Sequence, residues 1–340
     1  MVSTFLAGIT PDARGSDGTL LFDLTPLRDA PSVECQDLNA PDGELNAEAV
    51  AGLDALIIAS SRFRVSRETV EGVDRLALIA RLGAGYETID LDACTAAGVA
   101  VTTAPEAVRR TMATAAIAFL LALTLKIPQK ERSLREGRWA DGPGDLGVGI
   151  VERTIGIVGL GNIGTEIARL AAPFSPRLLA CDPDPSAPTD LEQSVELVVL
   201  DELLARSDVV VVSCPLNDST RRLLSRERLA LLKPSAFLVN IARGPIVDQE
   251  ALVEMLESGR LAGAALDVFE DEPLDPAHPL LRLPNVIATP HAIGWTDEAC
   301  RIGGRAASRA VLAVAAGSLP EHVVNLEVLE RPNFLAKLQS

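Results

Sequence analysis

The chain has 340 residues, 48% of them apolar and 23% charged, so it is long enough for two domains and too apolar to be disordered. Its net charge of −16 repels nucleic acid and anionic lipid, and we expect neither as a partner. Five cysteines without a Cys-x-x-Cys pair, together with three histidines, predict no metal site and fit a reducing cytoplasm. The N-terminal residues lack the basic start and long apolar run of a signal peptide, so we expect none.

The first part of the chain alternates strand and helix patterns. Short apolar runs at residues 55–59, 76–82 and 99–102 predict buried strands. A helix that is apolar on nearly all sides is predicted over about 112–125. Its apolar run is too short to span a bilayer, which favours a buried helix.

A glycine-rich loop begins near the middle of the chain. Residues 154–158 predict a strand, Gly159, Gly161 and Gly164 have the G-x-G-x-x-G spacing, and residues 165–172 predict a helix. The first glycine permits a tight turn, the second lets a pyrophosphate approach the backbone, and the third allows close helix–strand packing. The phosphates would lie at the positive end of that helix, so the pattern predicts a dinucleotide site.

A carboxylate follows this loop at the spacing that a dinucleotide fold requires. Residues 178–182 predict a second strand that ends in Asp182, 18 residues after Gly164. The carboxylate that holds an adenine ribose is expected about 20 residues beyond the loop. The continuation Asp182-Pro183-Asp184 has no Arg or Lys to neutralise a 2′-phosphate, so NAD is predicted rather than NADP.

Strand–helix alternation continues to the C-terminus. Strands are predicted at 209–213, 236–240, 263–268 and 286–288, and helices at 201–206, 226–232, 248–258 and 296–317. Such alternation predicts α/β domains whose parallel sheets carry helices on both faces. The last helix is too small to be a domain alone. We therefore predict a discontinuous substrate-binding domain of residues 1–103 and 296–340, with a nucleotide-binding domain of residues 104–295 inserted in it.

Three polar residues lie at the carboxyl ends of predicted strands, where ligands bind in such sheets. Arg243 supplies either a fork of donors for a substrate carboxylate and carbonyl or a surface charge. Asp267 ends an apolar strand and must be paired there, as a buried structural partner or as a cofactor contact. His291 is either an acid/base group for carbonyl reduction or a hydrogen-bonded loop residue, whereas His278 and His322 are predicted at the surface.

The loop F269-E-D-E-P-L274 adds three carboxylates, a pattern typical of a solvated loop. Pro273 fixes the backbone beside Glu272, but composition alone does not favour Glu272 over Glu270. Hydride transfer to a carbonyl leaves negative charge on oxygen, so the reaction needs an acid and a nearby cation. Histidine and arginine supply both, and a carboxylate against the histidine orients it and favours its protonated form.

Five motifs in chain order resemble the D-isomer-specific 2-hydroxyacid dehydrogenase family: GLGNIG (159–164), SCPLNDST (213–220), NIARGPIVD (240–248), GAALDVFEDEPL (263–274) and TPH (289–291). The resemblance implies two doubly wound parallel-sheet domains, a Rossmann nucleotide domain inserted in a flavodoxin-like substrate domain, with the active site in the cleft. It implies Arg243, Glu272 and His291 as catalytic residues and so selects Glu272 among the carboxylates. It also implies a homodimer through the nucleotide domain.

The resemblance further implies which residues border the ligands. Those around NAD would be Gly159, Gly161, Asn162, Ile163, Gly164, Asp182, Cys214, Pro215, Thr220, Ile241, Ala242, Arg243, Asp267, His291 and Gly294. Those around the substrate would be Ser60, Gly83, Ala84, Gly85, Arg243 and Trp295. The backbone N–H groups of residues 83–85 would receive the substrate carboxylate.

Together these features predict an NAD-dependent oxidoreductase that interconverts a 2-oxo acid and a D-2-hydroxy acid, with His291 as acid/base. Two alternatives stay open: D-3-phosphoglycerate dehydrogenase-type activity, and a non-catalytic NAD(H)-sensing regulator. Ser60 stands where phosphoglycerate dehydrogenases have an Arg that grips phosphate, which weakens the first. The intact catalytic residues argue against the second, because a sensor needs no such set.

Overall fold

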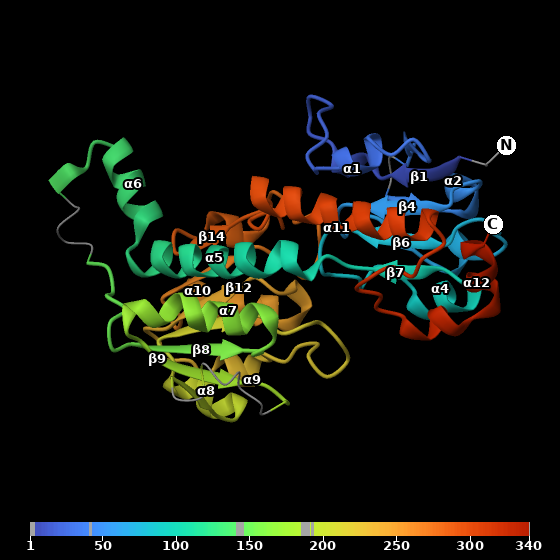
Figure 1. Ribbon diagram of the computed structural model, residues 1–340. Coiled ribbons are helices and arrows are strands. Elements are labelled where there is room, and N and C mark those ends of the chain that lie inside the picture. Colours follow the sequence, from blue (N-terminus) through green and yellow to red (C-terminus); the bar gives the residue numbers. More distant parts are fainter. Residues whose placement is uncertain (1–3, 41–42, 141–145, 185–190, 192–193, 340) are drawn as a thin grey trace. The chain divides into compact units, whose positions relative to one another are not determined.

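The computed structural model describes residues 4–40, 43–140, 146–184, 191 and 194–339 (Figure 1). The chain forms two compact units, one of Met1–Val108 with Trp295–Ser340 and one of Arg109–Gly294. The first unit is therefore discontinuous in sequence, and the second is inserted in it.

The first unit is built on a five-stranded parallel sheet with the order β2-β1-β4-β6-β7. Its strands are β1 (Phe5–Ile9), β2 (Val33–Asp37), β4 (Ala55–Ile58), β6 (Leu78–Arg81) and β7 (Ala100–Thr102), and β3 (Glu44–Leu45) pairs with β5 (Arg64–Val65) in a separate sheet. Its helices are α1 (Thr25–Arg28), α2 (Ala47–Val50), α3 (Arg67–Val70), α4 (Leu91–Ala97), α11 (Asp297–Ala315) and α12 (Pro332–Leu338). Counted along the chain, the order of the five strands is 2-1-3-4-5, as in flavodoxin-like folds.

The second unit is built on a seven-stranded parallel sheet with the order β10-β9-β8-β11-β12-β13-β14. Its strands are β8 (Thr154–Val158), β9 (Arg177–Cys181), β10 (Val195–Leu197), β11 (Val209–Val212), β12 (Phe237–Asn240), β13 (Gly263–Leu266) and β14 (Val286–Ala288). Its helices are α6 (Ile127–Arg135), α7 (Asn162–Ala171), α8 (Leu200–Arg206), α9 (Arg226–Leu229) and α10 (Gln249–Glu257), with most of α5 (Pro105–Thr124). The first six strands have the Rossmann order 3-2-1-4-5-6.

Both sheets bury apolar side chains on two faces. In the second unit one face of the sheet packs on α5 and α7, and the other packs on α8, α9 and α10. In the first unit α1 and α11 cover one face, while α2, α3 and α4 cover the other. Strands buried on both faces are typical of parallel sheets, and β8 and β11 are buried along their whole length. The predicted α/β class with doubly wound parallel sheets is confirmed.

The long apolar helix α5 begins at Pro105, earlier than the predicted start near residue 112. Proline at the first helical position already has the required φ and loses no hydrogen bond there. By length and composition α5 is the one helix in the described part of the chain that is able to cross a membrane. Half of its most apolar window is buried, and Ala116, Phe119 and Leu120 lie in the core of the second unit.

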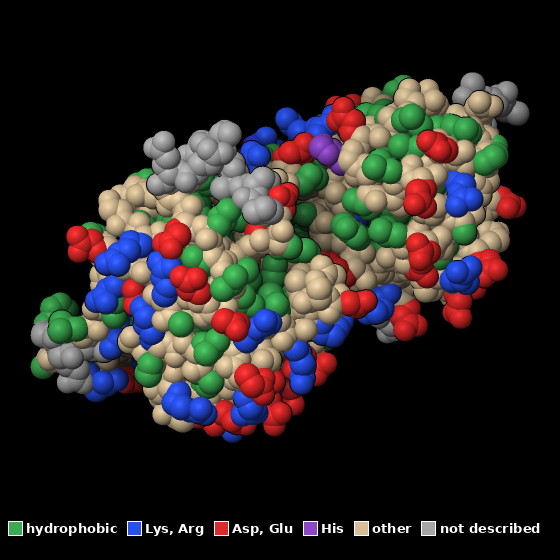
Figure 2. Space-filling model, turned by 90° about the horizontal axis from the view of Figure 1, so that it is seen from below, with side chains coloured by type: hydrophobic (Ala, Val, Ile, Leu, Met, Phe, Trp, Pro, Cys, Tyr) green, Lys and Arg blue, Asp and Glu red, His purple; other side chains and the backbone are tan. Residues whose placement is uncertain are grey.

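Helix α6 differs from the others because none of its residues is buried. It follows α5 and extends away from the sheet of the second unit (Figure 1). Charged side chains of both signs are interspersed over the molecular face drawn in Figure 2.

Candidate active site

The candidate residues gather at the carboxyl edge of the seven-stranded sheet because four neighbouring strands end at the same level. The terminal residues of β11, β12, β13 and β14 are register partners: Val212, Asn240, Leu266 and Ala288. The loops that follow these strands therefore leave the sheet side by side. Arg243, Asp267 and His291 lie within the first residues of three of them.

The strand order reverses between β8 and β11, and dinucleotides bind at such a switch point. The glycine loop follows β8 and Cys214 follows β11. Gly159 has a φ of +93°, which only glycine adopts readily, and a Cβ there would lie 2.7 Å from the backbone nitrogen of Cys214. The loop and Cys214 are thus in direct backbone contact at the switch point.

The other two glycines of the loop have different surroundings. A Cβ on Gly164 would overlap the carbonyl oxygen of Gly159, so α7 packs directly on the loop. A Cβ on Gly161 would meet nothing within 4 Å, and no side chain caps the helix at this residue. Open space therefore lies over the uncapped N–H groups at the start of α7, which is the setting that binds a pyrophosphate.

Asp182 follows β9, the strand beside β8, and is fixed by two backbone groups. Its Oδ2 accepts a hydrogen bond from the N–H of Leu160 at 2.6 Å, and its Oδ1 accepts one from the N–H of Asp184 at 3.0 Å. The first bond ties the carboxylate to the glycine loop itself. The side chain is half-buried, so it remains accessible to a ribose.

His291 and Glu272 form a close pair from different loops. Nδ1 of His291 lies 2.7 Å from Oε2 of Glu272, and Oε1 of the same carboxylate accepts a hydrogen bond from the N–H of Phe269 at 3.0 Å. With both carboxylate oxygens engaged, the carboxylate holds the imidazole in one orientation. His291 has a φ of +53°, a left-handed conformation that non-glycine residues rarely adopt.

The pKa of Glu272 is raised by one influence and lowered by several others. Burial raises the pKa of this carboxyl, but the hydrogen bond and charge of His291, the N–H of Phe269 and the charge of Arg243 together lower it below its ordinary value of 4.5. Glu272 is therefore an anion at neutral pH.

Arg243 stands on a turn that its neighbours hold. The buried Asn240, the last residue of β12, donates from Nδ2 to the carbonyl of Arg243 at 3.0 Å and accepts from the N–H of Ala242 at 3.0 Å. Nη1 of Arg243 donates to the carbonyl of Ala242 at 2.6 Å. The guanidinium is thus fixed next to its own loop at the sheet edge.

Asp267 is only 2% exposed, and one of its oxygens organises the His291 loop. Oδ1 accepts hydrogen bonds from Oγ1 of Thr289 at 2.6 Å and from the N–H groups of Ala292 and Ile293 at 3.0 and 3.1 Å. Burial raises the pKa of Asp267 in spite of these donors. Asp267 therefore holds the loop that carries His291.

Comparison with known proteins bears on what this edge does. The model of the D-isomer specific 2-hydroxyacid dehydrogenase NAD-binding domain matches residues 117–292, slightly more than half of the chain. A glyoxylate reductase of Korarchaeum cryptofilum is 36% identical over 293 residues, which cover 85% of this chain and 88% of that protein.

The chain belongs to the D-isomer specific 2-hydroxyacid dehydrogenase family.

Two further relatives agree with this membership. A D-3-phosphoglycerate dehydrogenase of Methanocaldococcus jannaschii is 37% identical over 282 residues, 82% of this chain, which spans about half (53%) of that relative's length. The crystal structure of a glyoxylate reductase from Paecilomyes thermophila superposes with a TM-score of 0.82 at 28% identity and covers 95% of this chain and 99% of that one. The predicted family is confirmed, and the matched NAD-binding domain confirms NAD as the cofactor.

Other residues predicted to border the cofactor follow β11, β12 and β14 or open α7. Burial raises the pKa of the Cys214 thiol to about 11, so the thiol stays protonated and behaves as an apolar wall. Thr220 donates from Oγ1 to the carbonyl of Pro215 at 2.6 Å and closes the loop after β11. Ile241 and Ala242 are buried just after β12, Asn162 and Ile163 open α7, and Gly294 lies against Met112.

The predicted substrate residues Ser60, Gly83, Ala84 and Gly85 lie in the first unit. The buried guanidinium of Arg81 donates to the carbonyl of Gly85 at 2.8 Å and to that of Ser60 at 2.5 Å. The N–H of Ser60 donates to Oδ2 of Asp12 at 2.9 Å. Trp295 is in edge contact with Phe22, with ring centroids 5.5 Å apart.

Sequence reasoning missed several residues that shape the site. Thr289 and Asn240 belong to motifs quoted in the sequence analysis. They were missed because the sequence does not reveal which groups their side chains hydrogen-bond. Gln249 and His278 form a contact at 3.2 Å, and His278 is half-buried, not a surface residue as predicted. Among the described residues no cluster of three His, Cys, Asp or Glu is arranged to hold a metal ion.

Proposed function

We propose that this chain is an NAD-dependent oxidoreductase that interconverts a 2-oxo acid and a D-2-hydroxy acid. The observation that carries the proposal is the pairing of His291 with Glu272 at 2.7 Å, at the sheet edge where Arg243 follows β12. Carbonyl reduction needs an acid, a group that holds the acid, and a cation for the developing oxyanion. These residues provide all three.

The glycine loop and Asp182 would hold the cofactor. The pyrophosphate would lie over Gly161 at the start of α7, and Asp182 would accept hydrogen bonds from the adenine ribose. Cys214, Pro215, Thr220, Ile241 and Ala242 would border the dinucleotide. When bound, the reduced nicotinamide supplies a hydride to the substrate carbonyl carbon.

The catalytic residues act on the substrate oxygen. Because Glu272 engages Nδ1 of His291, the other ring nitrogen is the one that donates a proton to the oxygen in reduction and removes it in oxidation. Glu272 stabilises the protonated imidazole and holds its orientation. Arg243 binds the substrate carboxylate and stabilises the negative charge on the carbonyl oxygen.

The substitution His291→Gln tests this assignment. We expect NADH oxidation with a 2-oxo acid to fall by at least about a hundredfold, the usual contribution of a positioned acid. NADH affinity, measured by fluorescence titration, should stay within about threefold of wild type because the glycine loop and Asp182 are untouched. His322→Gln, the same change at an exposed histidine of the other unit, is the matched control. Full turnover in the His291 variant would contradict the role.

Small and medium 2-oxo acids, such as glyoxylate, hydroxypyruvate and aliphatic 2-oxo acids, are the substrates we propose. The similarity to the phosphoglycerate dehydrogenase of M. jannaschii favours a phosphorylated substrate as the second candidate. Ser60 opposes that candidate, since serine carries no charge with which to grip a phosphate. A substrate panel that includes a phosphorylated 2-oxo acid separates the two. The regulator alternative predicts NADH binding without turnover of any 2-oxo acid.

A homodimer through the nucleotide-binding unit is also part of the proposal. Helix α6 buries none of its residues, and Leu134 and Trp139 are 57% and 80% exposed. Residues 126–138 carry five basic side chains (Lys126, Lys130, Arg132, Arg135 and Arg138) against Glu131 and Glu136, whereas the whole chain has a charge of −16. A basic arm with exposed apolar side chains complements the acidic surface of a second copy.

We also propose a cytoplasmic location. All five cysteines are free, and their thiols persist where glutathione keeps the environment reducing.

A further inference from the structure

We propose that Gln249 is a positioning residue that fixes the loop bearing Glu272 against the loop bearing Arg243. The inference rests on the proposed function, because it gives Gln249 a role in the reaction that Arg243, Glu272 and His291 carry out. It concerns only contacts within the second unit.

Gln249 belongs to the segment that carries Arg243. The chain passes from Arg243 through a short 3₁₀ turn, Gly244–Ile246, to Asp248, which caps α10 by accepting from the N–H of Ala251 at 3.0 Å. Gln249 is the first residue of that helix. Its side chain therefore projects from a position that the cap makes rigid.

The Glu272 loop touches this segment directly. A Cβ on Gly244 would overlap the backbone of Phe269 and Glu270, so the two main chains are in contact and no side chain fits between them. Such contact fixes how far apart the loops are. It does not fix their relative angle, because van der Waals packing has no direction.

Hydrogen bonds of the Gln249 side-chain amide fix the relative angle of the two loops. Its Oε1 accepts a hydrogen bond from the N–H of Glu270 at 3.0 Å, and its Nε2 lies 3.2 Å from Nε2 of His278. The neighbouring N–H, that of Phe269, donates to Glu272, which holds His291. Of these two successive N–H groups, that of Glu270 binds Gln249 on α10 and that of Phe269 binds the carboxylate of Glu272.

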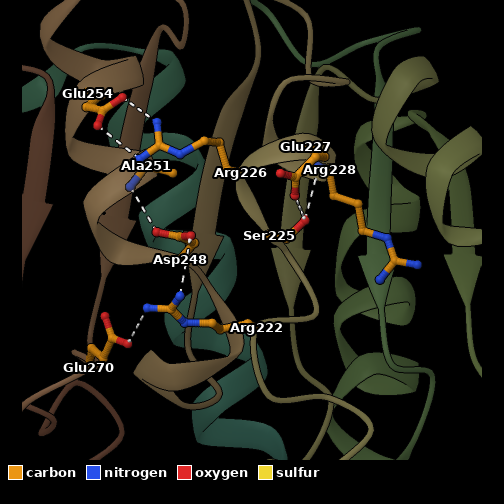
Figure 3. A network of polar contacts seen from close by, with 9 residues as sticks. All are labelled: Arg222, Ser225, Arg226, Glu227, Arg228, Asp248, Ala251, Glu254 and Glu270. Atoms are coloured by element: carbon orange, nitrogen blue, oxygen red, sulfur yellow. Dashed lines mark hydrogen bonds and ion pairs between the residues drawn. The ribbon is translucent and has the colours of Figure 1, made fainter.

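A second link spans the same two loops on the solvent side. Figure 3 shows the guanidinium of Arg222 between Asp248 and Glu270, 3.9 and 3.4 Å from their oxygens. Arg222 is 59% exposed, and exposed ion pairs contribute little. Its backbone N–H also donates to the carbonyl of Pro245 at 2.8 Å. Gln249 is half-buried, so water weakens its hydrogen bond to Glu270 less than it weakens the ion pairs of Arg222.

The test compares Gln249→Met, which keeps the length but removes the acceptor, with Gln249→Glu, which keeps an acceptor for the N–H of Glu270. We expect kcat for 2-oxo acid reduction to fall about 3- to 10-fold in the Met variant, the effect of one hydrogen bond of ordinary strength. KM for the 2-oxo acid and the Kd for NADH should change less than about twofold, because Arg243 and the glycine loop remain. The Glu variant should recover most of the lost kcat.

Glu250→Met, the same change at the next, exposed position of α10, is the matched control and should match wild type. Amide hydrogen exchange in the cofactor-free protein adds a readout that needs no turnover. The N–H of Glu270 should exchange faster in Gln249→Met than in Gln249→Glu or wild type.

An unchanged kcat in Gln249→Met, or a Glu variant as slow as the Met variant, would overturn the positioning role. If the wild-type protein turns over no 2-oxo acid, the proposed function fails. The exchange of Glu270 would then still report whether Gln249 holds the loop.

Discussion

At the scale of single residues, the site depends on side chains that hold other side chains. Glu272 fixes His291, Asp267 fixes the backbone around His291, and Asn240 shapes the turn of Arg243. The left-handed conformation of His291 persists because Asp267 accepts from the two N–H groups that follow it. The positions of His291 and Arg243 therefore depend on the partly exposed Glu272 and on the buried Asp267 and Asn240.

The lowered pKa of Glu272 makes a prediction about stability and pH. A carboxyl whose pKa is lower in the folded than in the unfolded protein stabilises the fold above its unfolded pKa, and that stability is lost as pH falls through the folded pKa. The difference in unfolding free energy between wild type and Glu272→Gln should therefore be larger at about pH 7 than at about pH 3. Denaturant titration at both values measures it. Equal differences at the two pH values would contradict a lowered pKa of Glu272.

At the scale of structural elements, each glycine of the loop before α7 is required for a different physical reason. Gly161→Ala adds a methyl group to open space, so the fold should keep its Tm while the Kd for NADH rises about tenfold or more, since the methyl lies where the pyrophosphate approaches. Gly164→Ala overlaps the Gly159 carbonyl and should lower both Tm and NADH affinity. Thermal melts and NADH titrations separate the two effects.

Gly149→Ala is the control for this pair, because a Cβ at Gly149 also meets nothing within 4 Å but lies outside the loop. It should leave NADH affinity unchanged. If Gly161→Ala binds NADH as wild type does, the pyrophosphate does not lie at this end of α7.

Sequence patterns predicted most of the buried strands, but they missed β1 and α4, which also bury apolar side chains. Strand β8 was predicted to the residue, since buried parallel strands are continuous apolar runs. Helix α7 begins at Asn162, three residues before the predicted start. Helix α6 has no buried face, so no apolar periodicity marks it. Strand β2, V-E-C-Q-D, lies at the sheet edge with mostly exposed side chains and gave no clear pattern.

The candidate site was predicted in the same uneven way. Arg243, Asp267 and His291 follow predicted strands, and the sheet topology alone brings them to one edge. Glu272 required the family resemblance, because composition does not separate it from Glu270. Gln249 was missed because its contact with Glu270 joins residues 21 positions apart through a loop geometry that no local pattern encodes.

At the scale of the whole molecule, the exposed arm predicts the oligomeric state. Wild type should elute with twice the chain mass of 35.9 kDa in light-scattering chromatography, and Leu134→Glu with Trp139→Glu should shift it toward the monomer by placing charge in a desolvated contact. Leu326→Glu, at an exposed leucine of the other unit, should leave the mass unchanged. A double variant that stays dimeric would place the contact elsewhere.

The most direct test of the central claim is NADH oxidation by the wild-type protein across a panel of 2-oxo acids, with NADPH in parallel. The account predicts turnover of one or a few 2-oxo acids with NADH and a clear preference for NADH over NADPH, because Asp182 repels a 2′-phosphate. Tight NADH binding without turnover of any 2-oxo acid would contradict the catalytic role of His291 and Glu272.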